Sequence, residues 1–374
     1  MKKVLFVATV VRLHINMFHK PYIQWFHDQG WQVDVAANND YATPSECVIP
    51  FCDNFYCLPF ERSPLKLGNW KAYKQLRKLL DENHYDIIHC HTPMGSVITR
   101  LAAASARNKG TKVIYTAHGF HFFKGSSFLN WLIYYPIEKI LSHRTDLLLT
   151  MNQEDFSAAQ RFHAKRVINV NGVGMDLSRF AEASPDQRHA VRQELALQES
   201  DTFAISVAQL IPRKNHRVLI QAIAKLNDPS FHLFIVGDGL QEQELKALSS
   251  SLNVHDRIHF LGFRKDVYRL CSAADIFLFA SLQEGLPVAL MEAMACGLPI
   301  IASNIRGNID LIDPESGGWL VSPTDVDGFS AAIRNAMNHR NMWPSMKAHN
   351  LAKVQHYSID AVVAQMAEIY KGIM

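Results

Sequence analysis

The chain has 374 residues, 48% of them hydrophobic and 20% charged, which indicates a globular protein long enough for two domains. No window approaches the eighteen or so apolar residues of a membrane span, and MKKVLFVATV leads into a strand rather than a signal peptide. The net charge is +3, but residues 1–175 hold 20 Lys and Arg against 13 Asp and Glu, whereas residues 176–374 hold 18 against 22.

The basic first half predicts contact with an anionic partner. Charge alone does not distinguish between three such partners: nucleic acid, anionic lipid headgroups and a diphosphate lipid. The six cysteines, at positions 47, 52, 57, 90, 271 and 296, form no C-x-x-C pair. We therefore expect reduced thiols in a cytoplasmic protein, with no zinc site and no disulfide framework.

The first half alternates apolar runs typical of buried strands with helical patterns. Residues 10–20 follow the first strand as a predicted ligand loop; this loop lacks G-x-G-x-x-G, which argues against NAD or FAD. Asn69 is the expected cap of a helix. Predicted strands cover residues 3–9, 31–37, 86–91, 112–118, 146–152 and 166–172, and predicted helices cover 69–84, 95–108, 127–143 and 153–162, besides one ending near Gly30.

The second half repeats this rhythm after a predicted linker over residues 172–184. Its predicted strands cover residues 202–210, 231–237, 257–263, 275–281 and 299–304, and its predicted helices cover 215–226, 240–251, 266–274 and 287–296. Residues 358–374 have the pattern of an amphipathic helix. Alternation of this kind predicts an α/β protein with two doubly wound parallel sheets.

The stretch from Glu284 to Gly297, EGLPVALMEAMACG, follows the last but one of these strands. Pro287 suits the first position of a helix and Gly297 its end, so Glu284 lies in the loop and Glu292 in the helix. Backbone N–H groups at Gly285, Leu286 and Val288 would then stabilise an anion at the helix N-terminus. Two carboxylates beside such a helix end suit a ligand with both hydroxyls and phosphates, such as a nucleotide sugar.

This stretch is similar to the retaining glycosyltransferases of family 4. The resemblance is specific because E-x₇-E lies within S-x-x-E-G-x-P-x-x-x-x-E-A-M-A-C-G-x-P-I-I-A-S, from Ser281 to Ser303. It implies the GT-B fold, in which two Rossmann-like domains face each other across a cleft. The domains would cover residues 1–175, joined by helix 358–374, and residues 176–357. The first would bind the acceptor and the second the nucleotide sugar.

The resemblance also implies roles for the two carboxylates and their loop. Glu292 would bond the ribose hydroxyls, and Glu284 would bond hydroxyls of the donor sugar, with Gly285 and Leu286 beside the phosphates. The alternative is that both glutamates are solvated residues that flank a helix and have no functional role. Glu292 lies among apolar neighbours, however, and a buried carboxylate needs a partner.

The segment VAQLIPRKNH supplies cations after the first strand of the second domain. Arg213 and Lys214 there are expected to neutralise a diphosphate leaving group, although a basic surface turn would have the same composition. Many family members have Arg where this chain has Gln209, so one guanidinium is missing. Gly237 is expected to line the nucleotide site with its backbone; Phe263 and Arg264 are placed near the base without a side-chain role.

His118 ends a strand of the first domain, where a structural histidine is the ordinary interpretation. Position and resemblance favour a catalytic role, in which a neutral imidazole bonds the sugar or orients the acceptor. Acceptor contacts are expected from two groups of residues. Arg12, His14, His19 and Lys20 lie in the loop after the first strand, and His91, His121 and Lys124 lie on the same rim as His118. We expect His89 and His91 on opposite sides of their strand, so no shared metal ion is predicted.

Residues 128–140, FLNWLIYYPIEKI, admit two interpretations. One is a buried helix kinked at Pro136. The other is an interfacial patch with Trp131 and Tyr134 at the level of the lipid headgroups and with basic residues nearby. The surrounding HGFHFFKG…NWLIYYPIEK is similar to capsule and exopolysaccharide glycosyltransferases that act on lipid-linked sugars.

Together these features predict a retaining glycosyltransferase at the cytoplasmic face of the inner membrane. It would move a hexose or N-acetylhexosamine from a UDP-linked donor to a polyprenyl-diphosphate-linked saccharide. We expect no cofactor, no metal requirement and no nucleic-acid partner. Two alternatives remain: another enzyme on the same fold, such as a nucleotide-sugar epimerase or a phosphorylase, and a non-catalytic partner subunit, which Gln209 keeps open.

Overall fold

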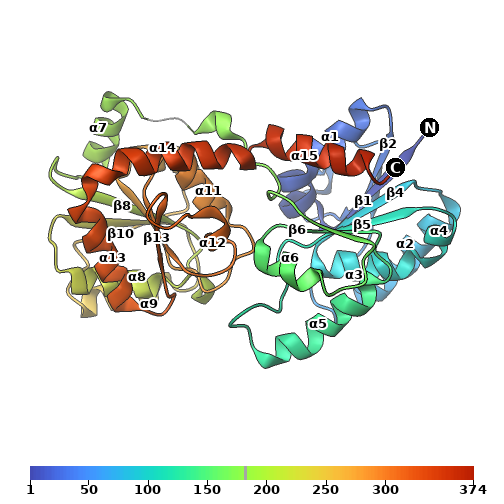
Figure 1. Cartoon of the computed structure of the whole chain (residues 1–374), viewed down its shortest axis with the longest axis horizontal. Helices are drawn as coiled ribbons and strands as arrows, with labels where there is room; N and C mark the ends of the chain where they lie inside the picture. Colours follow the sequence, from blue (N-terminus) through green and yellow to red (C-terminus); the bar gives the residue numbers. More distant parts are fainter. Residues whose placement is uncertain (181–182) are drawn as a thin grey trace. The chain divides into compact units, whose positions relative to one another are not determined.

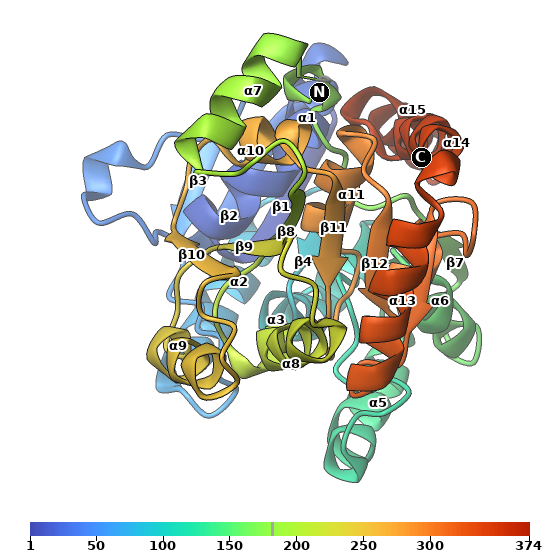
Figure 2. The ribbon, with the colours of Figure 1, turned by 90° about the vertical axis from the view of Figure 1, so that its left-hand side faces the viewer.

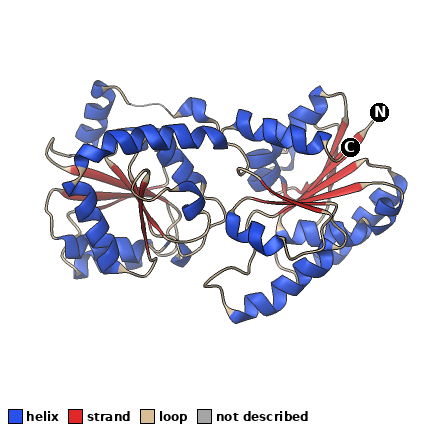
Figure 3. Ribbon diagram, viewed as in Figure 1, coloured by secondary structure: helices blue, strands red, loops and turns tan. Residues whose placement is uncertain are grey.

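The computed structural model describes residues 1–180 and 183–374, and Figure 1 shows its helices and strands. The chain forms two compact units, Met1–Gly174 with Ile359–Met374, and Met175–Ser358. Residues 181–182 of the predicted linker lie outside the described part of the chain. In each unit the strands form one sheet with helices on both faces (Figure 3). The prediction of two parallel-sheet, Rossmann-like domains is confirmed.

The first unit contains a seven-stranded parallel sheet in the order β3-β2-β1-β4-β5-β6-β7. The order reverses at β1, so the gap beyond the carboxyl ends of β1 and β4 is the switch point where ligands bind in such sheets. Its strands are β1 (Lys3–Val10), β2 (Gln32–Asn38), β3 (Asn54–Cys57), β4 (Ile87–His91), β5 (Lys112–Thr116), β6 (Leu147–Thr150) and β7 (Arg166–Asn169). Its helices are η1 (Val11–His19), α1 (Lys20–Asp28), α2 (Leu67–Glu82), α3 (Pro93–Ala102), α4 (Ala104–Asn108), α5 (Phe128–Ser142), α6 (Gln153–Ala159) and α15 (Ile359–Lys371), besides the short η2 (Pro44–Glu46).

Aromatic side chains pack α1 and α15 against one face of this sheet. The ring of Phe6 on β1 lies 5.9 Å from that of Phe26 on α1, which in turn lies 4.6 Å from Tyr370 on α15. The Tyr370 hydroxyl also forms a 2.8 Å hydrogen bond with Nδ1 of His89 on β4. The last helix of the chain, α15, therefore packs against the sheet that contains the first strand, β1.

The second unit contains a six-stranded parallel sheet in the order β10-β9-β8-β11-β12-β13. The order reverses at β8, which places its switch point between β8 and β11. The strands are β8 (Thr202–Val207), β9 (Phe231–Val236), β10 (Ile258–Gly262), β11 (Ile276–Phe279), β12 (Ile300–Ser303) and β13 (Gly318–Val321). The helices are α7 (Pro185–Glu194), α8 (His216–Leu226), α9 (Glu242–Ser251), α10 (Val267–Ala273), α11 (Val288–Ala295), α12 (Asn308–Leu311), α13 (Val326–Asn338) and α14 (Trp343–Val354), with short turns η3 (Leu177–Arg179), η4 (Pro212–Lys214), η5 (Arg340–Met342) and η6 (Gln355–Tyr357).

Alternate residues of these strands pack against different helices. On β8, Ile205 joins the cluster that includes α7, α10, α11 and α14, whereas Ala204 joins the cluster that includes α8, α9 and α13. Figure 2 shows α8, α9 and α13 on one side of the strands and α10 and α11 on the other. Because both faces are covered, the strands are nearly continuous apolar runs.

The structure corrects several local predictions. Residues 11–19 form a π-helix rather than a loop. Asn69 does not cap α2, which begins at Leu67; its buried amide instead accepts from the Glu61 N–H and donates to the Ser63 carbonyl. The helix predicted over 95–108 is divided into α3 and α4. The predictions omitted β3, α7, α12, β13, α13 and α14. Among the described residues, none of the helices is long and apolar enough to span a bilayer.

Candidate active site

An ion pair joins the two loops at the switch point of the second unit. Lys214 follows β8 and Glu284 follows β11, and Lys214 Nζ lies 2.5 Å from Glu284 Oε1. The loops are also joined by the Leu282 N–H, which donates to the Arg213 carbonyl at 2.8 Å. The cationic and acidic groups predicted from separate motifs therefore lie at one point on the sheet edge.

Two arginines hold the Glu284 loop. Arg213 Nη1 donates to the Gln283 carbonyl at 2.7 Å and lies 3.4 Å from Glu284 Oε2. Arg306, which follows β12, donates through Nε to the Glu284 carbonyl at 3.0 Å. Three cationic side chains thus approach one buried acidic loop, an arrangement suited to a polyanionic ligand.

The Lys214 ammonium is partly desolvated. Burial lowers its pKa, and the Glu284 carboxylate opposes this by favouring the charged form. Its ammonium also lies 5.1 Å from the centre of the Phe279 ring at the end of β11. A cation in such a site interacts more strongly with an approaching anion than it would in water.

Glu292 lies on α11, the helix that follows the Glu284 loop. Among the described residues its carboxylate has no hydrogen-bond or ion-pair partner. Burial raises its pKa, and Arg179 lowers it only in part. A carboxylate that is largely buried without a partner is poised to accept hydroxyl donors from a ligand.

Glycines allow the loops at this edge to approach each other. Gly237, after β9, has φ 142°, and a Cβ there would lie 2.0 Å from the Ala208 carbonyl oxygen. Gly307 has φ 78°, and a Cβ there would lie 2.4 Å from the Gly285 carbonyl oxygen. Any larger residue would separate the β8, β9, β11 and β12 loops that form the candidate site.

The remaining predicted donor residues occupy the same sheet edge with different surroundings. Gln209 is exposed directly after β8. Phe263, after β10, is 70% exposed, so its ring is accessible to a planar base. Arg264 is engaged elsewhere, because its guanidinium pairs with Asp266 at 2.7 Å and Glu194 at 3.0 Å. Leu286 packs partly buried against the core, with Gly285 beside it.

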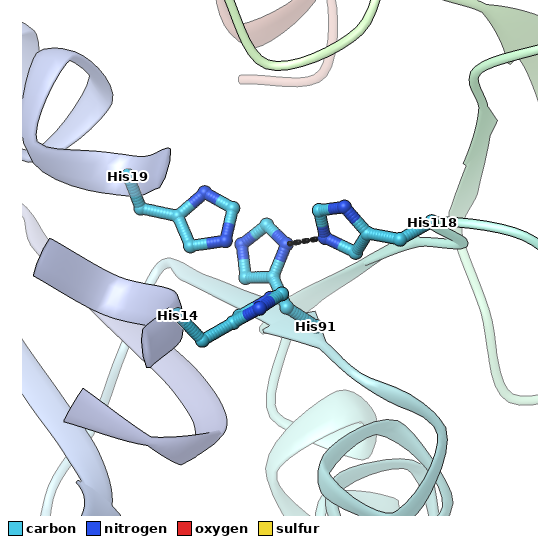
Figure 4. A group of neighbouring side chains, drawn as sticks. All are labelled: His14, His19, His91 and His118. Atoms are coloured by element: carbon cyan, nitrogen blue, oxygen red, sulfur yellow. Dashed lines mark hydrogen bonds between the residues drawn. The ribbon is translucent and has the colours of Figure 1, made fainter. Parts of the chain in front are cut away.

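Four histidines gather at the switch point of the first unit, as Figure 4 shows. His14 and His19 come from η1, His91 ends β4, and His118 follows β5. One ring nitrogen from each lies within 4.8 Å of the others. His118 Nε2 and His91 Nδ1 are 3.4 Å apart, and the rings of His19 and His91 stack at 3.7 Å.

The π-helix explains how His14 and His19 reach one point. Residues five apart on an α-helix project about 140° away from each other. In a π-helix the backbone hydrogen bonds join residues i and i+5, so the same two residues lie about one turn apart on nearly the same face. Their ring centres are indeed 4.9 Å apart.

The imidazoles of this cluster are neutral. Burial lowers the pKa of His118 to about 4. Burial first, and neighbouring cations or histidines second, lower the pKa values of the others well below 6.5. Within the described ranges 1–180 and 183–374, four buried ring nitrogens of the cluster have no hydrogen-bond partner, namely Nε2 of His14, both nitrogens of His19 and Nε2 of His91. Each such atom costs about 1–3 kcal/mol.

The prediction that His89 and His91 face opposite sides of β4 is wrong. Residues i and i+2 of a strand share a face, and the two ring centres are 4.1 Å apart. The nitrogens of His89 are both occupied, Nε2 by Thr116 at 2.8 Å and Nδ1 by Tyr370. His89 is therefore a structural histidine, whereas Nε2 of His91 has no partner in the part of the chain that the structure describes.

The other predicted acceptor residues, Arg12, Lys20, His121 and Lys124, are all exposed. Arg12 and Lys20 lie on η1 and at the start of α1, with both side chains exposed. His121 is also exposed and stacks on Tyr134 with 4.6 Å between ring centres. Lys124 is exposed, and its N–H donates to Glu154.

Helix α5 exposes a row of large apolar side chains. They are Phe128, Leu129, Trp131, Leu132, Ile133, Ile137 and Ile140. A buried ion pair helps to anchor the helix: Glu138 lies 2.9 Å from the Arg100 guanidinium, which lies over the Tyr115 ring at 4.3 Å. The interpretation of residues 128–140 as a buried core helix is therefore wrong.

Sequence reasoning missed two residues beside these groups. Arg306 follows β12, and its position after an apolar strand at the same sheet edge was the available signal. Thr92 follows β4 with φ 62°, a conformation that is unusual for a β-branched residue and that gathers at functional sites. Its hydroxyl lies 2.6 Å from that of Thr9, so it joins the end of β1 to the segment after β4.

Two family models match the chain. The model described as glycosyl transferases group 1 matches residues 187–353, and that described as glycosyl transferase 4-like matches residues 3–152. A Bacillus subtilis protein named "Putative glycosyltransferase EpsD" is 37% identical over 377 residues, which cover 100% of this chain and 97% of the relative. An Escherichia coli protein named UDP-Gal:alpha-D-GlcNAc-diphosphoundecaprenol alpha-1,3-galactosyltransferase is 32% identical over 71% of this chain and 70% of its own length.

Solved structures show the same fold. Anabaena Alr3699/HepE in complex with UDP has a TM-score of 0.81 at 22% identity, covering 100% of both chains. WaaG, a glycosyltransferase involved in lipopolysaccharide biosynthesis, has a TM-score of 0.74 at 19% identity, covering 98% of this chain and 99% of that one. The chain therefore belongs to the family 4 glycosyltransferases of the GT-B fold.

Proposed function

We propose that this glycosyltransferase moves a hexose or N-acetylhexosamine from a UDP-linked donor to a polyprenyl-diphosphate-linked saccharide during surface polysaccharide synthesis. The Lys214–Glu284 pair at the switch point of the second unit is the observation that carries the donor assignment. A relative named for a UDP-sugar donor and a diphosphoundecaprenol acceptor supports both substrate classes, as does the UDP-bound HepE structure.

The donor diphosphate replaces Glu284 as the partner of Lys214. Arg213 and the N–H groups at the start of α11 share the diphosphate charge, which favours its departure. Released from Lys214, the Glu284 carboxylate accepts hydrogen bonds from the donor sugar. Glu292 accepts from the ribose hydroxyls, which satisfies its buried carboxylate.

The transfer proceeds with retention of the anomeric configuration. The acceptor hydroxyl attacks the anomeric carbon on the face that the diphosphate leaves, so the new glycosidic bond forms where the bond to the phosphate oxygen breaks. The acceptor proton passes to that departing oxygen, and UDP is released. Glu284 holds the sugar and forms no covalent bond, His118 orients the reacting groups, and no metal is required.

The acceptor binds the first unit around the histidine cluster. Its diphosphate contacts the exposed cations Arg12, Lys20 and Lys124, and its sugars contact the histidines of the same edge. The excess of basic residues in the first 175 positions favours an anionic acceptor.

The exposed row on α5 docks to the anionic inner leaflet, where such an acceptor resides. Trp131 and the aliphatic residues enter the interface, while Lys124, Lys139 and Arg144 meet anionic headgroups. We expect co-sedimentation with vesicles that contain phosphatidylglycerol, reduced by Leu132→Glu. The matched control is Leu240→Glu, because Leu240 is 99% exposed in the second unit. Equal loss in both variants would contradict docking through α5.

Acceptor-dependent release of UDP tests the reaction itself. UDP release that needs a polyprenyl-diphosphate-linked saccharide supports transfer, and Glu284→Gln is expected to abolish most of it, whereas Glu46→Gln, an exposed glutamate, leaves it intact. Release of UDP with an altered free sugar and no acceptor would identify an epimerase. Nucleotide binding without any turnover would identify a non-catalytic partner subunit, consistent with Gln209.

A further inference from the structure

The histidine cluster combines ligands from three separate elements of the first unit. The π-helix η1 supplies His14 and His19, β4 supplies His91, and the segment after β5 supplies His118. These elements meet beyond the carboxyl ends of β1, β4 and β5, at the ligand-binding edge of a doubly wound sheet. Figure 4 shows the four rings converging on one another.

The spacing of the rings fits a tetrahedral ion. A metal–nitrogen bond of about 2.0–2.1 Å gives an edge of about 3.3 Å between two ligands of a tetrahedron. His118 Nε2 and His91 Nδ1 are 3.4 Å apart, close to that edge. The ligand atoms of all four residues lie within 4.8 Å, so small side-chain rotations bring His14 and His19 to the same distance.

Unpartnered nitrogens indicate that the cluster is incomplete without a ligand. His19 is fully buried, and neither of its ring nitrogens has a hydrogen-bond partner among the described residues. His91 is also fully buried, and in the described part of the chain the only hydrogen-bond partner of its Nδ1 is Nε2 of His118, at 3.4 Å. The adjacent His89, by contrast, is buried with both nitrogens bonded. Burial alone therefore does not explain why His19 lacks partners, because the equally buried His89 has them.

We propose that His14, His19, His91 and His118 bind one divalent transition-metal ion of the Zn²⁺ class. Imidazole nitrogen suits Zn²⁺, Co²⁺, Ni²⁺ and Cu²⁺, whereas Mg²⁺ and Ca²⁺ prefer oxygen ligands. The group contains no carboxylate among the described residues, so selection against Mg²⁺ follows from its donors. Binding of the metal ion requires only these four side chains, so it does not depend on the proposed transfer reaction.

The bound ion occupies the lone pair of His118. His118 then cannot orient the reacting groups, so the same ion inhibits glycosyl transfer. Release of the ion restores an imidazole that is available to the substrate. This consequence rests on the proposed function, whereas binding does not.

Titration of the full chain, without an affinity tag, with Co²⁺ alone tests the site. Four-coordinate Co²⁺ gives intense visible absorption, which reports geometry without any assay of activity. We expect one equivalent to produce this spectrum and Zn²⁺ to displace it. His118→Gln, at a half-buried position, should lose the spectrum and weaken Zn²⁺ binding by roughly tenfold or more. Unchanged circular dichroism and unchanged UDP binding at the second unit show that the variant is folded.

A second histidine pair provides the matched control. His143 and His163 are exposed and stack with 3.9 Å between ring centres. His163→Ala should leave the Co²⁺ spectrum and stoichiometry unchanged. Octahedral Co²⁺, binding that survives His118→Gln, or binding that His163→Ala removes would each overturn the proposal. Stabilisation by inorganic pyrophosphate in the absence of any metal binding would also overturn it and would identify an anion site.

Discussion

Lys214 Nζ lies 2.5 Å from Oε1 of Glu284, and the two residues belong to the loops after β8 and β11, the strands that flank the switch point of the second sheet. Because both side chains are largely buried, removing either charge would leave the other buried without a partner, which is unfavourable. The pair therefore keeps the cation desolvated and in place until a stronger anion replaces the carboxylate.

Replacing Lys214 by Met should weaken the binding of UDP by tenfold or more and leave the binding of uridine unchanged. The reason is that uridine lacks the diphosphate, and a charge-assisted hydrogen bond contributes about 1.5–3 kcal/mol. Isothermal titration calorimetry measures both affinities. Lys246→Met, at an exposed position on α9, is the control. Equal losses for UDP and uridine would show that Lys214 supports the loop rather than the diphosphate.

Replacing Glu292 by Gln should stabilise the ligand-free protein and weaken nucleotide binding. Burial raises the pKa of Glu292, so the neutral amide avoids the cost of a desolvated charge. We therefore expect the ligand-free variant to unfold at a higher Tm than the native chain. Differential scanning fluorimetry with and without UDP measures both effects. If Glu292 contacts the 2′-hydroxyl, the variant and the native chain should bind 2′-deoxy-UDP with equal affinity. A lower Tm for the ligand-free variant would contradict the assignment of Glu292 as a buried, unpaired carboxylate.

The buried His216 should contribute acid sensitivity to the second unit. Burial, and secondarily Lys214, lower its pKa from 6.5 to about 4. The unfolded chain therefore binds more protons below pH 6.5, and stability is lost as pH falls from 6.5 towards 4. At pH 5 this loss is about 2 kcal/mol for one such group. Urea unfolding at pH 7 and pH 5 should show a smaller loss for His216→Leu than for the native chain, and identical losses would refute the assignment.

The buried ion pair of Arg100 and Glu138 should fix α5 to the first unit. Glu138→Gln leaves the Arg100 charge without its 2.9 Å partner, which costs about 3–5 kcal/mol. The double variant Arg100→Met with Glu138→Leu removes both charges and should recover most of that stability. Urea unfolding of the three chains measures the difference. Additive losses in the double variant would show that the pair is not coupled.

The alternation of apolar runs was sufficient to predict most strands and helices, because buried parallel strands leave a clear pattern. The candidate site at the second switch point could be located for the same reason: Lys214 and Glu284 lie in the segments that follow two such strands, and Glu292 lies within the helix after the second segment. The contribution of Arg306 was not predicted, because its contact is to a backbone carbonyl and no motif marks it.

The histidine cluster shows where sequence reasoning failed. His14 and His19 are five residues apart, which places them apart on an α-helix and leaves them unrelated in a loop. Only the π-helix of residues 11–19 brings them to one face, and the sequence pattern does not distinguish it. The exposure of α5 was equally open, since an apolar helix without polar periodicity fits either a core or an interface.

The most direct measurement is UDP release from UDP-sugars, with and without a polyprenyl-diphosphate-linked saccharide, by the native chain and by Glu284→Gln. The account predicts release that depends on the acceptor and that falls by roughly a hundredfold in the variant, because the donor sugar is no longer held in place. Release that is independent of the acceptor, or near-normal turnover by Glu284→Gln, would contradict the assignment of the β8–β11 edge as the donor site.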